Sequence, residues 1–186
     1  MIENTGMQNM IEKITEIVKE ELVTTEREEL IRRRKAQAEI HKMEQEKYEI
    51  NKIKFLGKPH TVRMLNLLRE TQKINEVTGY IDIEYGTAYY LLSSYEDIYN
   101  KARKYISSDG IKFKNMLSKQ DFSTGEKILV KLAANLFNSN NYDIAPIDII
   151  GYLDDELFDV AMSAIMMRRN ENLTLGILVN QMALKG

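Results

Sequence analysis

The sequence predicts an all-α protein, with a long charged helical arm at the N-terminus and a compact multi-helix domain after it. Residues 11–56 contain no glycine or proline, and Glu, Lys and Arg fill nearly every second position of that stretch. The residues that follow form several short helical patterns with clean apolar faces. A charged rod followed by a small core is typical of a protein that binds another macromolecule.

The two parts are expected to meet at Gly57, Lys58 and Pro59. The residue before a proline is displaced from the α region, and glycine permits a left-handed helix cap. We therefore expect an arm over residues 1–58 and a compact domain over residues 59–186.

Apolar residues of the arm recur at three- and four-residue steps and form a narrow seam. The seam contains Ile11, Ile14, Ile17, Val18 and Leu22, continues through Leu30 and Ile31, and becomes thinner among charges at Ala36, Ile40, Met43 and Ile50. Such a seam at a/d-like spacing is typical of a coiled coil, either with a second copy or with a partner helix. Ile40, Met43 and Ile50 are therefore candidate interface residues. Because Thr25 and Glu28 match a capping box, we expect the arm to break there into two helical segments.

The compact domain shows helical patterns over 60–73, 87–106, 113–117, 124–137, 146–152, 155–169 and 173–184. Ser123 and Glu126 form a capping box for the fourth of these, Pro146 fits the first position of the fifth, and Asp154 fits the N-cap of the sixth. At most one short β-strand is expected, near residues 80–85, where apolar and polar residues alternate.

Three segments of the C-terminal half, Leu132–Asn138, Leu153–Phe158 and Ala164–Arg169, carry a sequence pattern that resembles a known family. In that family of small uncharacterised helical bacterial and prophage proteins, a helix that ends in Asn-Leu-Tyr/Phe-Asn precedes a Leu-Asp-x-x-x-Phe helix that ends in Arg. The resemblance covers about residues 120–170 and implies a small helical fold and an origin in a mobile element. It implies no activity.

Composition excludes several classes of site. The chain has no cysteine, which removes disulfides, thiolate nucleophiles and Cys-based zinc sites. The formal net charge is -2, so no global field attracts nucleic acid. Residues 1–9 lack the basic and apolar regions of a signal peptide, and no stretch approaches the roughly 20 apolar residues of a membrane span. We expect a cytoplasmic protein that does not enter a membrane.

Catalytic chemistry finds little support in the sequence, and we expect neither an enzyme nor a bound metal or cofactor. His41 and His60 are expected to be a solvated arm residue and a loop residue. The acidic cluster at 154–159 has no calcium-loop spacing, and its N-terminal helical position explains it better. The segment 123–127 lacks the spacing and the preceding strand of a phosphate-binding loop.

Two surface features are candidate binding elements. Arg32, Arg33, Arg34 and Lys35 form a basic girdle, which would contact phosphates or an acidic partner, unless nearby glutamates merely balance it on a solvated helix. Tyr89 and Tyr90 are adjacent, and we expect at least one of them to be partly exposed and available to an interface.

These features predict a non-enzymatic protein-binding module, encoded by a phage or mobile element, that binds and inhibits or regulates a larger host protein. A nucleic-acid enzyme such as a CRISPR nuclease is one such target. Two alternatives stay open. The first is a nucleic-acid-binding regulator that uses the basic girdle, and the second is a self-associating structural or assembly protein. All three include homo-oligomerisation through the arm.

Overall fold

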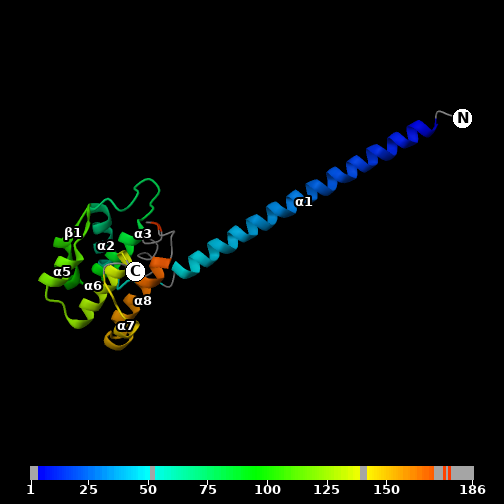
Figure 1. Cartoon of the computed structure of the whole chain (residues 1–186). Coiled ribbons are helices and arrows are strands. Elements are labelled where there is room, and N and C mark those ends of the chain that lie inside the picture. Colours follow the sequence, from blue (N-terminus) through cyan, green and yellow to red (C-terminus); the bar gives the residue numbers. More distant parts are fainter. Residues whose placement is uncertain (1–3, 51–52, 139–141, 170–173, 175, 177–186) are drawn as a thin grey trace. The chain divides into compact units, whose positions relative to one another are not determined.

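The computed structural model describes residues 4–50, 53–138, 142–169, 174 and 176. The chain separates into two compact units, residues 1–46 and residues 47–186 (Figure 1). Helices account for most of the described residues of both units, and the one sheet among these residues has two strands of two residues each. The all-α prediction is therefore confirmed.

The described residues of the first unit all belong to one helix, α1 (Asn4–Ile50), which has 47 residues and continues into the first residues of the second unit. The expected break at Thr25 is wrong, since the helix runs through Thr24 and Thr25 without interruption. Threonine costs less than about 1 kcal/mol relative to alanine in a helix interior, which is too little to end a helix flanked by strong helix-forming residues. A helix of this length measures roughly 70 Å from end to end.

The arm also ends earlier than the glycine and proline at 57–59 predict. α1 ends at Ile50, and residues 53–56, which we call the strap, belong to the second unit. Ile53 and Phe55 are buried in the core of that unit. The segment reads Ile-Lys-Phe-Leu, and the alternation of Ile53 and Phe55 with Lys54 has the period of an extended chain.

Side chains and backbone of the second unit hold the strap from several sides. The Lys54 N–H donates to Ser163 Oγ over 3.1 Å, and the Tyr90 hydroxyl donates to the Lys54 carbonyl. The Phe55 ring packs edge-on against the Tyr90 ring, with 5.1 Å between the ring centroids. The strap is thus part of the core.

The core of the second unit is built around a short, almost fully buried helix, α3 (Ile83–Leu92). Every residue from Gly86 to Leu92 is buried, so the helix has no solvent-facing side over this stretch. It packs against α2 (Lys58–Glu70), α6 (Thr124–Phe137) and α8 (Asp155–Arg169) (Figure 1).

The single helix expected over 87–106 is divided into α3 and α4 (Glu96–Ala102). The chain turns at Ser93 and Ser94, whose backbone carbonyls accept hydrogen bonds of 2.8 Å each from the Arg63 guanidinium of α2. A side chain that satisfies the free carbonyls at a helix end allows the helix to stop without leaving unpaired polar groups in the core.

The extended segments are short, and only some of them lie at residues 80–85, where the sequence predicts a strand. Ile81 pairs with Ile74 and Tyr80 pairs with Thr174 in single antiparallel bridges, but α3 already begins at Ile83. The two-stranded sheet lies instead where the sequence indicates a turn, with β1 (Ile106–Ser107) antiparallel to β2 (Gly110–Ile111).

The remaining elements follow the predicted order: η1 (Arg103–Tyr105), α5 (Phe113–Lys119), α6, α7 (Pro146–Tyr152) and α8. The predicted capping box is confirmed, because Ser123 Oγ accepts from the Glu126 N–H and Glu126 accepts from the Ser123 N–H. Asp154 caps α8 by accepting from the Leu157 N–H over 2.8 Å. The helix expected over 173–184 lies outside the described residues, apart from positions 174 and 176.

The strap generates a stability prediction. Ile53→Ala removes a buried side chain and is expected to lower the free energy of unfolding by about 2–5 kcal/mol, because Ile53 is only 3% exposed. Ile150→Ala on α7 is the matched control, since Ile150 is 67% exposed, and it is expected to change that free energy by less than about 0.5 kcal/mol. Denaturant unfolding monitored by circular dichroism measures both. Equal effects of the two variants would contradict the placement of the strap in the core.

Candidate functional site

The sequence predicts no catalytic or metal site. In the part of the chain that the structure describes, Asp154 and Asp159 of the acidic cluster make structural contacts. No group of three or more His, Asp or Glu side chains in the described ranges is arranged to hold a metal ion. Asp159 of the acidic cluster pairs with Lys54 at 2.7 Å between the charged atoms, and Asp154 serves as the cap of α8. The acidic cluster is therefore part of the architecture of α8 and the strap.

His60 was expected in a solvated loop, and this expectation is wrong. The residue lies in α2 and is buried between the rings of Phe55 and Tyr90. Its Nδ1 accepts from the Leu56 N–H at 3.3 Å, so the proton resides on Nε2, which donates to the Tyr90 carbonyl at 2.8 Å. Both ring nitrogens are thus engaged in holding the strap against α3. The other histidine, His41, is exposed on α1, as expected.

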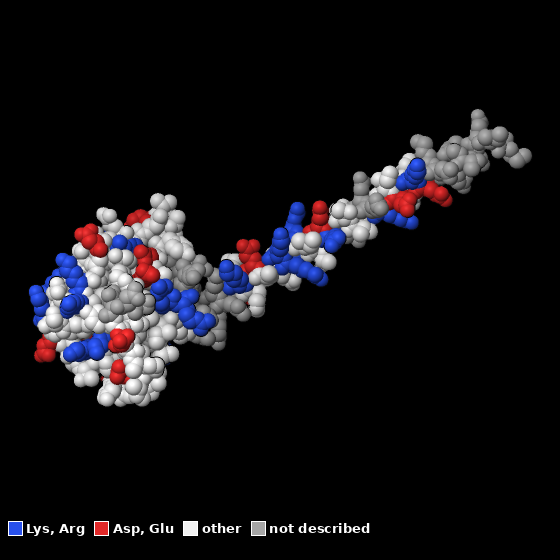
Figure 2. Space-filling model, viewed as in Figure 1, with Lys and Arg blue, Asp and Glu red and all other residues white. Residues whose placement is uncertain are grey.

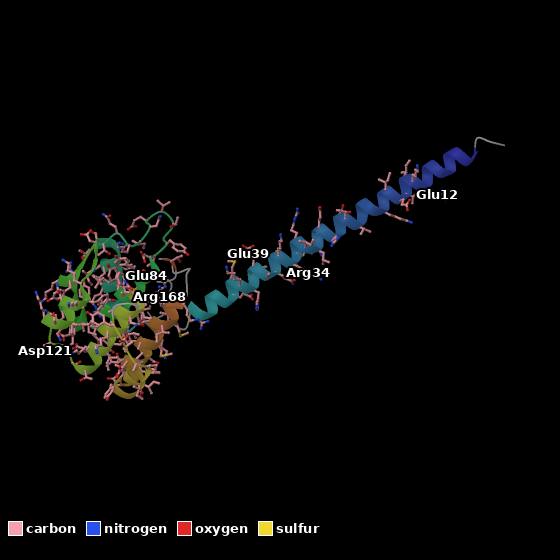
Figure 3. The ribbon with its side chains drawn as sticks, viewed as in Figure 1. Glu12, Arg34, Glu39, Glu84, Asp121 and Arg168 are labelled. Atoms are coloured by element: carbon pink, nitrogen blue, oxygen red, sulfur yellow. The ribbon has the colours of Figure 1, made fainter. Side chains whose placement is uncertain are left out.

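A surface hollow of about 800 Å³ lies where the ends of α6 and α8 meet the start of α3. Glu84 and Arg168 lie beside each other at its edge (Figure 3), with 3.0 Å between their charged atoms. Arg168 also donates to the Leu136 carbonyl at the end of α6 over 2.9 Å. These contacts use the arginine to tie three helices together, which is a structural role.

The adjacent tyrosines of α3 are core residues, and the expectation that one of them is partly exposed is wrong. Tyr89 and Tyr90 are both 0% exposed. The Tyr89 hydroxyl donates to Thr71 Oγ1 over 3.0 Å, while the Tyr90 hydroxyl donates to the Lys54 carbonyl. Neighbouring side chains of a helix point about 100° apart, and both directions are buried because α3 is enclosed by other helices.

Burial also fixes the protonation of these phenols. Removal from water raises the pKa of Tyr89 to about 12, against the smaller opposing effect of the hydrogen bond with Thr71. Burial likewise raises the pKa of Tyr90. The pKa of Tyr95 rises through burial and, secondly, through its hydrogen bond with the Glu156 carboxylate. All three hydroxyls therefore remain protonated donors well above neutral pH.

The arm carries the described residues that match the interface prediction. Ile14, Ile40 and Met43 of the seam expose 53%, 55% and 64% of their surface. Ile50 is the last residue of α1, and its side chain lies outside the described residues. A large apolar side chain normally loses its contact with water in a folded domain, at a gain of about 1.5–3 kcal/mol. These side chains are therefore accessible to a partner helix, as are Val23, Leu30 and Ile31 on other sides of α1.

The basic girdle is also exposed on α1. Arg32, Arg33, Arg34 and Lys35 all face solvent, and Arg33 forms an ion pair with Glu29 at 2.7 Å. Figure 2 shows positive and negative side chains interspersed along the arm, and Figure 3 shows Arg34 and Glu39 projecting from it. An exposed pair of this kind contributes at most about 1 kcal/mol, so these cations remain available to an anionic surface.

No family model, curated protein or solved structure matches the chain. The resemblance of residues 120–170 to small prophage proteins therefore stays an expectation. In the described part of the chain, no helix is long and apolar enough to cross a membrane.

The tyrosine environments predict a pH dependence. The ordinary phenol pKa is about 10. A phenol whose pKa is raised in the folded state leaves stability unchanged below the ordinary pKa, and stability falls as pH rises from the ordinary pKa to the raised one. We expect the free energy of unfolding to fall as pH increases above about 10. Absorbance titration should show phenolate forming at higher pH in the folded chain than in urea. Tyr89→Phe should remove one of the tyrosines that titrate at high pH. Simultaneous ionisation of all ten tyrosines near their ordinary pKa would contradict the raised pKa of the buried tyrosines.

Proposed function

We propose that the chain is a non-enzymatic protein-binding module whose arm supplies the binding surface. The observation that carries the proposal is the exposed seam of α1, in which Ile14, Ile40 and Met43 each expose more than half of their surface. A helix with a narrow apolar stripe among charges gains stability by packing against another helix. The proposal therefore commits to helix pairing as the mode of binding.

The partner we propose is a larger host protein that the module inhibits or regulates, with a phage or mobile element as the source of the gene. A nucleic-acid enzyme, such as a CRISPR nuclease, fits the expectation drawn from the sequence. The length of α1 supports this choice of partner, since a helix of 47 residues offers contacts over roughly 70 Å. A module that presents so long a helix covers an extended surface of its partner.

Substitution in the seam tests the proposal. The double variant Ile40→Asp, Met43→Asp introduces charges that pairing would bury, and it is expected to reduce the recovered partner to background in affinity capture from bacterial lysate treated with nuclease. Val77→Asp is the matched control, because Val77 is 95% exposed in the second unit, and it should leave capture unchanged. Mass spectrometry identifies the captured chain. Equal recovery by all three baits would exclude the seam as the binding surface.

The exposure of the basic girdle favours nucleic-acid binding as a second candidate function. Four adjacent cations on one helix cover several sides and can contact phosphates along a duplex. The Glu29–Arg33 ion pair weakens this potential but leaves the other three cations in solvent.

Salt dependence measures that candidate function. The variant in which Arg32, Arg33, Arg34 and Lys35 are all alanine is expected to bind duplex DNA more weakly and with a shallower salt dependence. Each phosphate contact contributes a slope of about −0.9 in the logarithm of the binding constant against the logarithm of salt concentration. Fluorescence anisotropy with a labelled duplex at several salt concentrations gives both quantities. Identical binding by wild type and variant would remove nucleic acid as a partner of the girdle.

A further inference from the structure

We propose that a second copy of this chain occupies the seam, in an antiparallel pair of α1 helices centred between Leu30 and Ile31. The inference goes beyond the proposed function, because it assigns the seam of the unbound protein to a second copy, and it rests on that function's premise that the seam pairs with a helix. Its physical basis is the continuity of α1, the positions that share one face of it, and the order of charges along that face.

The continuous helix brings most residues of the two halves of the seam onto one face, with Ile17, Leu30 and Ile31 outside it. A helix turns by about 100° per residue, so the positions of one face follow from the numbering once no break intervenes. Six described residues fall within an arc of about 80° on this basis: Thr25, Glu29, Arg32, Ala36, Ile40 and Met43. Ile14 lies on the same arc nearer the N-terminus. The face is therefore apolar towards both ends and carries a charged centre.

Some levels of that face match when the face is read from either end. Thr25 and Ala36 are equally far from the point between residues 30 and 31, and so are Glu29 and Arg32. In the sequence, Val18 matches Met43 and Ile11 matches Ile50 in the same way. An antiparallel pair with a twofold axis at this point therefore places apolar positions opposite each other at 11/50 and 18/43, whereas Ile14 lies level with Lys47 and Ile40 lies level with Glu21.

Charge decides the direction of the pair. In a parallel pair in register, Glu29 faces its own copy and Arg32 faces its own copy, which places like charges in contact twice. In the antiparallel pair, Glu29 faces Arg32 of the partner subunit, and the twofold axis repeats that favourable contact. A polar layer inside an otherwise apolar seam specifies the register of a coiled coil.

The flanking charges agree with this direction. Residues 26–29 contain three glutamates and one arginine, and the basic girdle at 32–35 follows two residues later. The antiparallel register lays the acidic block of each arm beside the basic girdle of the partner subunit. A parallel pair in register lays girdle against girdle, and like charges at close range oppose association.

The paired stretch is long enough for a coiled coil. The register overlaps residues 11–50 of both arms, and this stretch measures roughly 60 Å at the rise of an α-helix. A coiled coil pattern is significant when it extends over at least about three or four heptads, and about forty paired residues exceed that length. A second copy carries the same acidic block and basic girdle and therefore supplies the complementary charge order in the antiparallel pair. A different protein would need its own helix with a complementary order of charges.

Engineered cysteines test the register in the full chain, which has no cysteine of its own. Thr25→Cys and Ala36→Cys are made as separate variants, one with an affinity tag, and are oxidised alone and as a mixture. A disulfide needs Cα atoms within about 7 Å, and two copies of position 25 lie about 16 Å apart along the antiparallel pair. We therefore expect a cross-linked species only in the mixture. Val23→Cys mixed with Ala38→Cys is the matched control, because these positions share a level but lie away from the paired face, and it should not cross-link.

Sedimentation velocity of the unmodified chain accompanies the cross-linking. A dimer together with the cross-link in the Thr25→Cys and Ala36→Cys mixture supports the proposal. Cross-linking of Thr25→Cys with itself indicates a parallel pair and overturns it. A dimer without a cross-link in the mixture overturns the register, and a chain that stays monomeric overturns the self-pairing altogether.

The proposed function fails by a different result. A monomeric chain that still captures a protein through the seam retains that function and rejects only the second copy as its occupant. If the variant Ile40→Asp, Met43→Asp captures as much partner as the wild type, the proposed function is rejected. The sedimentation and cross-linking results still decide whether the arms pair.

Discussion

The enclosure of α3 is the constraint on which the second unit depends. Seven consecutive residues, Gly86–Leu92, are buried, so water is absent from every side of the helix. The hydroxyls of Tyr89 and Tyr90 find partners inside the protein, and an unpaired buried polar group costs about 1–3 kcal/mol, whereas the buried Thr87 hydroxyl of the same helix has no partner among the described residues. Thr71 of the segment after α2 accepts from Tyr89, and the strap accepts from Tyr90. The neighbours of α3 therefore supply both its apolar surroundings and its hydrogen-bond partners.

Sequence patterns predicted the elements whose signals are local. The capping box of Ser123 and Glu126, the N-cap at Asp154 and the proline at the start of α7 each depend on residues a few positions apart, and all three occur as predicted. The wrong predictions concern tertiary context. The prediction that Tyr89 or Tyr90 is partly exposed assumed a helix with one buried face, whereas α3 is buried on several sides. The end of α3 depends on Arg63, which is thirty residues away.

The candidate surface was predictable in outline and not in its geometry. Composition identified a helical arm, and Ile40 and Met43 are exposed on it, while their role in an interface stays a prediction. The capping box at Thr25 and Glu28 has the correct spacing, but the free energy that separates a capped break from a continuing helix is only about 1 kcal/mol. That small difference decides whether the two halves of the seam share one face, and sequence alone did not resolve it.

The strap gives the chain a defined mechanical connection. Any tension applied to the arm passes along the backbone into Lys54, whose N–H is held by Ser163 and whose carbonyl is held by Tyr90. These two bonds anchor a single residue to α8 and to α3, so the load divides between two helices of the core. The next residue, Phe55, is buried and packs its ring against Tyr90. A pull on the strap thus meets resistance from two partly buried hydrogen bonds and from the buried side chains of Ile53 and Phe55 on either side of them.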